Sequence, residues 1–173
     1  MGFDLHGSSK TEGSTYFRAN VWCWRPIWKF VSDHCSDILN ESQLKRGNYN
    51  DFVCITGVQS LALAEKLQSL IDDETVNHVT SEYEIERKKQ VKVQEIIMKA
   101  LDQWTEEQGA SCGNDLKGDD HEIWQMLYRR ASPLDGTASY PMEAEYIAEF
   151  TQFCKKSDEG LSLIHISEPT RPY

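Results

Sequence analysis

The segment Tyr16-Phe-Arg-Ala-Asn-Val-Trp-Cys-Trp-Arg-Pro-Ile-Trp28 holds three of the five tryptophans of the 173-residue chain, interspersed with two arginines. Aromatic side chains bury large apolar areas, so a cluster this dense predicts either part of a hydrophobic core or a binding surface. Both alternatives are open from the residues alone. No complete catalytic or cofactor motif accompanies the cluster, which favours a non-catalytic binding or accessory protein over an enzyme.

The periodicity on both sides of this segment predicts an α+β fold that is predominantly helical, with short N-terminal strands packed against about five helices. Alternation in Phe3–His6 predicts a strand with Asp4 and His6 on one face. A first helix is expected from about Arg25-Pro26 to Leu39, followed by a short helical turn at Ser42–Lys45. A capping box at Thr56–Gln59 predicts the start of a helix that ends at Asp72. Further helices are expected over Thr75–Gln108, over His121–Arg130 and from about Pro141. Loops are expected at Gly7–Gly13, Gly47–Asp51, Ala110–Asp120 and Ser132–Tyr140.

Composition narrows the classes of partner. The net charge is −10 and the pI is about 4.9, which argues against binding to long nucleic acids or anionic membranes. No apolar run reaches membrane-spanning length. The five cysteines are an odd number without a Cys-x-x-Cys pair, which indicates reduced thiols and a cytoplasmic protein. The sequence leaves the oligomeric state open.

The aromatic–arginine segment predicts a pocket for a small anionic ligand such as a nucleotide, because tryptophan faces stack on bases and arginine binds phosphate. Polar residues of the Gly47–Asp51 loop would complete the pocket. The predicted ligand-binding residues are Tyr16, Arg18, Asn20, Trp22, Arg25, Asn50 and Asp51. In the alternative, Trp24 and Trp28 belong to the core and the arginines pair with the surplus carboxylates.

A second hypothesis is a metal-dependent hydrolase. Asp4 and His6, with His34 or Asp51, offer the carboxylate and imidazole donors that divalent metals use. The alternative is an Asp–His pair that only secures the strand. Cys35 next to His34 does not predict a catalytic thiol, because neighbouring side chains on a helix point about 100° apart.

A third hypothesis rests on the long helix expected over Thr75–Gln108. Its ends are apolar, and the charged run Glu84–Lys92 between them indicates a solvated face with pairs such as Glu84–Lys88. Such a helix would serve as a docking element for a helix of a protein partner.

Several motifs together resemble a family of uncharacterised proteins found mainly in phage and environmental sequences. They are Gly2-Phe-Asp-Leu-His-Gly7, Tyr16-Phe-Arg-x-Asn-Val-Trp22, Trp24-Arg-Pro-x-Trp28, Tyr49-Asn-Asp51, Tyr140-Pro141 and Glu149-Phe-x-x-Phe-Cys154. The resemblance implies a phage or bacterial origin and no particular activity. Some members carry Cys-x-x-Cys-x-Gly-x-Gly elements similar to a chaperone-type zinc knuckle, whereas this chain has only Cys112-Gly113 in that region.

The end of the chain has a different character. Leu161-Ser-Leu-Ile-His-Ile-Ser-Glu-Pro-Thr-Arg171 resembles a translated sequencing adapter. We therefore expect a single native domain over residues 1–160, truncated at its C-terminus, followed by an adapter-derived tail over residues 161–173.

Overall fold

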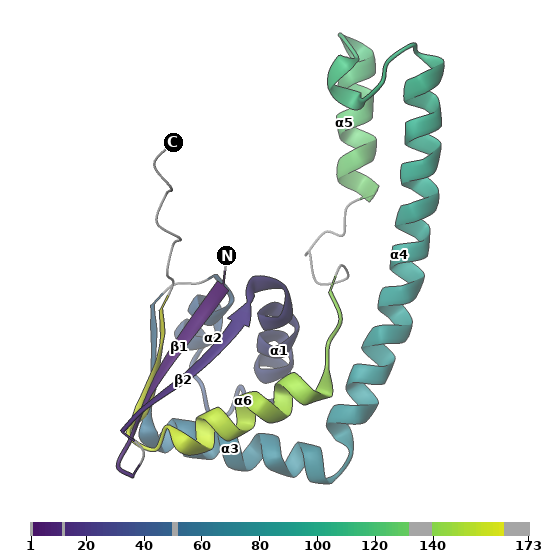
Figure 1. Cartoon of the computed structure of the whole chain (residues 1–173). Helices are drawn as coiled ribbons and strands as arrows, with labels where there is room; N and C mark the ends of the chain where they lie inside the picture. The colour runs from purple at the N-terminus through teal and green to yellow at the C-terminus, as the bar shows by residue number, and fades with distance from the viewer. Residues whose placement is uncertain (1, 12, 50–51, 132–139, 165–173) are drawn as a thin grey trace. The chain divides into compact units, whose positions relative to one another are not determined.

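A computed structural model describes residues 2–11, 13–49, 52–131 and 140–164 (Figure 1). The predicted α+β class, with helices predominating, is confirmed. Where one domain over residues 1–160 was expected, the chain divides into two compact units, Met1–Glu82 with Met142–Tyr173 and Tyr83–Pro141. Helix α4 (Thr75–Glu107) begins in the first unit and continues into the second.

An antiparallel sheet forms the centre of the first unit. Its strands follow the order β2 (Gly13–Asn20), β1 (Gly2–Ser9), β4 (Gly160–Ile164) and β3 (Val53–Thr56). The loop predicted over Gly7–Gly13 is shorter than expected, because β1 continues to Ser9 and β2 begins at Gly13. The glycine at position 7 serves close packing and not a turn, since an added Cβ would lie 2.0 Å from the Ser157 hydroxyl.

Strand β4 contains the first residues of the segment that was expected to be an appended tail. It pairs with β1 through Leu5↔Leu163 and with β3 through Val53↔Leu163, so it completes the sheet between them. Leu161 is buried. A short segment that alternates apolar and polar residues fits a pleated sheet with one buried face, whatever its origin. The adapter origin of this segment stays a prediction.

The core lies between one face of the sheet and helices α1 (Val21–His34), α3 (Gly57–Asp72) and α6 (Ala144–Lys156). Trp24 is fully buried at its centre. Its ring stacks on Phe3 of the sheet and Trp28 of α1, at centroid distances of 5.3 and 5.2 Å, and meets Phe150 of α6 edge-on at 5.5 Å. The indole N–H groups of Trp24 and Trp28 donate to the Gly47 and Leu44 carbonyls of α2 (Glu41–Tyr49).

Helix α1 begins earlier than its proline suggested. The Asn20 side chain caps it by accepting hydrogen bonds from the backbone N–H groups of Trp22 and Cys23, so the helix starts at Val21. Pro26 then lies inside the helix, where it removes one backbone hydrogen bond. The helix ends at His34, short of the predicted Leu39.

The later helices match their sequence signals more closely. The Thr56–Gln59 capping box is confirmed, and α3 ends at Asp72 as predicted. Helix α4 ends at Glu107, close to the predicted Gln108. The expected loop at 110–120 contains the short helix η1 (Gly113–Asp115), and α5 (Asp119–Ala131) follows it. Gly47 lies within α2, so the loop predicted to start there is wrong, while Asn50, Asp51 and most of the Ser132–Tyr140 loop fall outside the described residues.

The contact between α1 and α2 gives a test of the fold. An added Cβ at Gly47 would lie 2.2 Å from Cζ2 of the buried Trp28 ring. We expect Gly47→Ala to lower the free energy of unfolding by about 1–3 kcal/mol, because the indole and α2 must separate. Urea denaturation followed by tryptophan fluorescence measures the change, and Ser42→Ala on the exposed side of α2 is the control. Equal stability of the two variants would contradict this packing.

Candidate functional site

The outer face of the sheet carries a polar cluster of Asp4 and His6 from β1 and Tyr16 and Arg18 from β2. The strand register sets Asp4 opposite Arg18 and His6 opposite Tyr16. The Asp4 carboxylate accepts a hydrogen bond from the Tyr16 hydroxyl, and its Oδ1 lies 3.7 Å from the Arg18 Nε. The His6 and Tyr16 rings are 5.1 Å apart. The prediction that Asp4 and His6 share a face is therefore confirmed.

The Asp4 carboxylate dominates the electrostatics of this cluster. The hydrogen bond to Asp4 raises the pKa of Tyr16, and desolvation and the negative charge of Asp4 raise it further, while Arg18 lowers it by less. The Asp4 side chain is only 7% exposed, whereas that of Arg18 is 66% exposed. A carboxylate at the middle of the cluster offsets the arginine, so the arrangement favours internal pairing over capture of an anion.

The other predicted ligand-binding residues that the structure describes lie at the end of β2 and on α1. The Asn20 side chain is used as the α1 cap. Trp22, in the first turn of α1, is 43% exposed, and Arg25 is half-buried on the same helix. Asn50 and Asp51 lie outside the described residues. The alternative in which Trp24 and Trp28 belong to the core is confirmed, and the anion pocket stays a prediction.

Metal binding gains no further donors from the fold. Within the described ranges, no three side chains among His, Cys, Asp and Glu gather closely enough to hold a metal ion. The ring of His34 lies against Phe30, 4.4 Å between centroids, and Asp51 is not described. Cys112-Gly113, the region compared with the zinc knuckle, packs against α5: an added Cβ at Gly113 would lie 2.2 Å from the Trp124 ring. The backbone N–H of Cys112 donates a hydrogen bond to the Asp115 carboxylate.

The buried thiols are unsuited to nucleophilic chemistry. Cys35 is fully buried, and desolvation raises the pKa of its thiol to about 11. Desolvation also raises the pKa of the buried Cys154 thiol strongly. Because the thiolate is the reactive form, both side chains act as apolar core groups.

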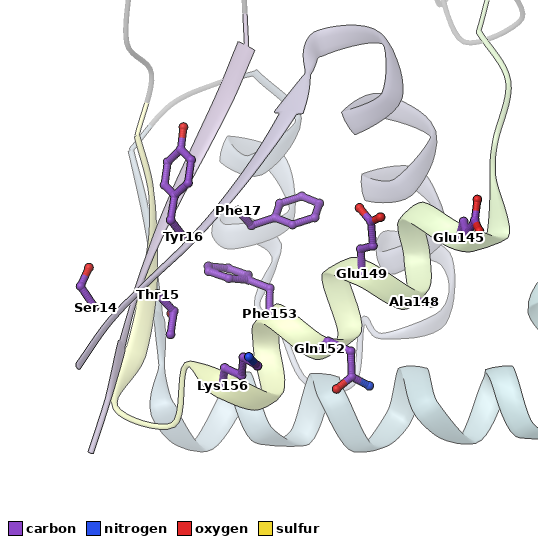
Figure 2. Close-up of a pocket in the computed structure, with 10 residues that line it drawn as sticks. All are labelled: Ser14, Thr15, Tyr16, Phe17, Glu145, Ala148, Glu149, Gln152, Phe153 and Lys156. Atoms are coloured by element: carbon purple, nitrogen blue, oxygen red, sulfur yellow. The ribbon is translucent and has the colours of Figure 1, made fainter. Parts of the chain in front are cut away.

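A groove of about 550 Å³ runs between strand β2 and helix α6 (Figure 2). The rings of Phe17 and Phe153 point into the space between the two elements, with centroids 5.7 Å apart. Polar side chains of α6 border the groove along its length. The lining residues are Ser14, Thr15, Tyr16, Phe17, Glu145, Ala148, Glu149, Gln152, Phe153 and Lys156. The sequence analysis missed this groove because it assigned no strand to residues 13–20.

The second unit carries a different surface. Helices α4 and α5 run side by side in opposite directions (Figure 1), and an apolar groove of about 280 Å³ lies between them. Ile96, Ile97, Ala100, Leu101, Trp104 and Leu127 line this groove. Beyond its rim, the apolar side chains Ile85 and Val93 of α4 and Ile123 and Met126 of α5 are exposed. A count of apolar residues on both faces of α4, instead of one stripe, would have found this surface from sequence.

Comparison with known proteins does not identify a family for this chain. No protein-family model, curated protein or solved structure matches the chain. No helix in the described part of the chain combines the length and apolar character needed to cross a bilayer.

The polar cluster predicts the titration of Tyr16. We expect the Tyr16 pKa to lie above its ordinary value of 10.0 and to fall toward it in Asp4→Asn, where the charged acceptor is lost. The protonated phenol is the form that the fold favours, so its stabilising effect is present at neutral pH and is lost as the pH rises through the raised pKa. NMR titration of ring-labelled tyrosine, assigned with Tyr16→Phe, measures this, and an unchanged pKa in Asp4→Asn would refute the assignment.

Four of the five thiols should separate into reactive and protected groups, with the half-buried Cys23 between them. Cys54 and Cys112 are exposed, whereas Cys35 and Cys154 are buried. We expect Ellman's reagent to label Cys54 and Cys112 in the folded protein, and Cys35 and Cys154 only after unfolding. Mass spectrometry of the labelled peptides identifies the sites. Rapid labelling of Cys35 in folded protein would show that α1 opens at its C-terminus.

Proposed function

We propose that this protein functions without catalysis, by binding protein chains, and that the helical unit of residues 83–141 docks onto a second copy of the same chain. One observation carries the proposal: α4 has apolar residues on two faces. A soluble helix that packs on one side is expected to be polar on the other. The five free thiols support a reducing, cytoplasmic location for such a protein.

The two apolar faces of α4 point in nearly opposite directions. At about 100° per residue, Val91, Leu101 and Thr105 fall on one face, where Leu101 and Thr105 are buried. Ile85, Val93, Ile96 and Ala100 fall within an arc of about 80° centred some 160° away. We call these four residues the outer stripe. Ile96 is 69% exposed and Val93 is 55% exposed, so the described part of the chain leaves these side chains of the outer stripe open to solvent. Ile96 and Ala100 also line the apolar groove beside α5, so the stripe continues into that groove.

Exposed apolar stripes that continue into an apolar groove are typical of protein-interaction sites. Burying a large aliphatic side chain contributes about 1.5–3 kcal/mol. In a two-fold dimer each residue of the stripe is buried twice, once in each copy, so even a short stripe contributes substantially to the free energy of association.

Charge along α4 favours a second copy as the occupant. Residues 84–93 contain four basic side chains and two carboxylates, and residues 94–107 contain four carboxylates and one lysine. The two glutamates of the basic half already pair with Arg87 and Lys89. An antiparallel copy therefore sets the basic half of each helix against the acidic half of the other, which is the self-complementary arrangement of a two-fold dimer.

The positions of the side chains suggest a register. Lys89 and Glu107 fall within the arc of the outer stripe, nine residues on either side of Met98. A two-fold axis that crosses α4 near Met98 sets Lys89 against Glu107 of the second copy. The same axis sets Ile96 against Ala100 of the second copy, so a large apolar side chain faces a small one.

Sedimentation velocity tests the proposal. We expect the wild-type chain of 19.9 kDa to sediment as a dimer of about 40 kDa. Ile96→Asp should weaken the dimer by more than about 100-fold, because each interface loses the isoleucine twice and gains two buried carboxylates. Val58→Asp on α3 is the matched control, since Val58 is 80% exposed and lies in the other unit.

Charge exchange then tests the register. Lys89→Glu and Glu107→Lys should each weaken the dimer, because each sets like charges together at both ends of the interface. The double variant Lys89→Glu/Glu107→Lys should restore it. A wild-type chain that stays monomeric at high concentration would refute the proposal, and a dimer that the exchange does not restore would refute the antiparallel register.

A further inference from the structure

We propose that the groove between β2 and α6 binds an extended peptide segment of another protein, which adds to the sheet as a strand next to β2 and places basic side chains against Glu145 and Glu149. This second surface lies in the first unit and is independent of the dimer proposed above.

Strand β2 provides the backbone for such binding. It lies at one end of the sheet, is eight residues long, and pairs only with β1 within the described chain. A long edge strand offers a row of backbone donors and acceptors that another strand can use. The opposite edge is different: β3 has four residues, and the Gln43 side chain of α2 donates to its Cys54 carbonyl.

The groove next to this edge offers room for side chains. Its floor is apolar, formed by Phe17 of β2 and by Phe153 and Ala148 of α6 (Figure 2). The part of β2 that lines it, residues 14–17, spans about 13 Å at about 3.3 Å per residue. Since alternate side chains of a strand point to the same face, a paired segment of that length directs two side chains toward α6.

Charge selects the chemistry of the occupant. Glu145 and Glu149 are exposed, one helical turn apart on α6, and both border the groove. The lining also holds one lysine, Lys156, so the two carboxylates leave the groove with a net negative charge. That charge repels phosphate and attracts lysine or arginine, so the site favours a basic peptide over a nucleic acid.

Binding of a synthetic strand tests the inference. The probe is a fluorescein-labelled, capped heptapeptide of sequence Thr-Lys-Thr-Val-Thr-Lys-Thr, which presents the same pattern in either strand direction. We expect it to bind, and the matched peptide with glutamate in place of lysine to bind at least about tenfold more weakly by fluorescence anisotropy. Glu145→Gln/Glu149→Gln should weaken the lysine peptide about tenfold, and Glu41→Gln/Glu65→Gln is the control of equal charge on α2 and α3.

Backbone methylation separates strand pairing from simple charge attraction. The backbone N–H groups of alternate residues in a strand point to opposite edges. Because the heptapeptide can pair in either direction, methylation of alternate residues alone leaves one direction able to donate to β2. N-methylation of the Lys, Val and internal Thr residues together removes the donors of both edges and keeps the charge, and we expect this peptide to lose binding.

Three results would overturn the inference: equal affinity for the lysine and glutamate peptides, no change in Glu145→Gln/Glu149→Gln, or undiminished binding of the N-methylated peptide. The titrations use wild type and Ile96→Asp in parallel, with circular dichroism to show that each variant is folded. If the peptide binds wild type and Ile96→Asp with the same affinity, the peptide result does not depend on whether the chain forms the proposed dimer.

Discussion

The stacking of Trp24 between Phe3 and Trp28 is the contact on which the first unit depends. It joins the sheet to α1, and the edge-on contact with Phe150 joins both to α6. The hydrogen bond from the Trp24 indole to the Gly47 carbonyl adds α2 to the same point. Because the polar edge of the indole is satisfied by backbone, the ring is buried without an unpaired donor.

That contact also positions the groove that we propose as a peptide site. Strand β2 passes into α1 without a loop, since Asn20 ends the strand and caps the helix. Fixing α1 therefore fixes the strand, with Phe17 directed toward α6 and Tyr16 and Arg18 directed to the outer face. The groove between β2 and α6 is a consequence of this packing, because Phe17 and Phe153 meet at its floor.

Negative charge is distributed in a way that fits binding to protein chains. On the sheet, the Asp4 carboxylate is held by Tyr16 and Arg18. On α6, Glu145 and Glu149 face solvent at the rim of a groove, and along α4 the carboxylates concentrate toward the C-terminal half. Buried thiols with raised pKa values take no part in chemistry. Shape and charge at two separate surfaces carry the two interactions that we propose.

Features that depend on neighbouring residues could be predicted from the sequence. The Thr56–Gln59 capping box, the extent of α4 and the shared face of Asp4 and His6 follow from local hydrogen bonding and periodicity. Other features depend on contacts between distant parts of the chain. Gly7 resembles a loop residue until Ser157 is seen to pack on it, and Pro26 resembles a helix start until the Asn20 cap is seen. Whether the tryptophans of the aromatic–arginine segment lie in the core also depends on contacts with Phe3, Phe150 and Gly47, which are distant in the chain. Burial and strand order arise from such long-range contacts, and no local pattern specifies them.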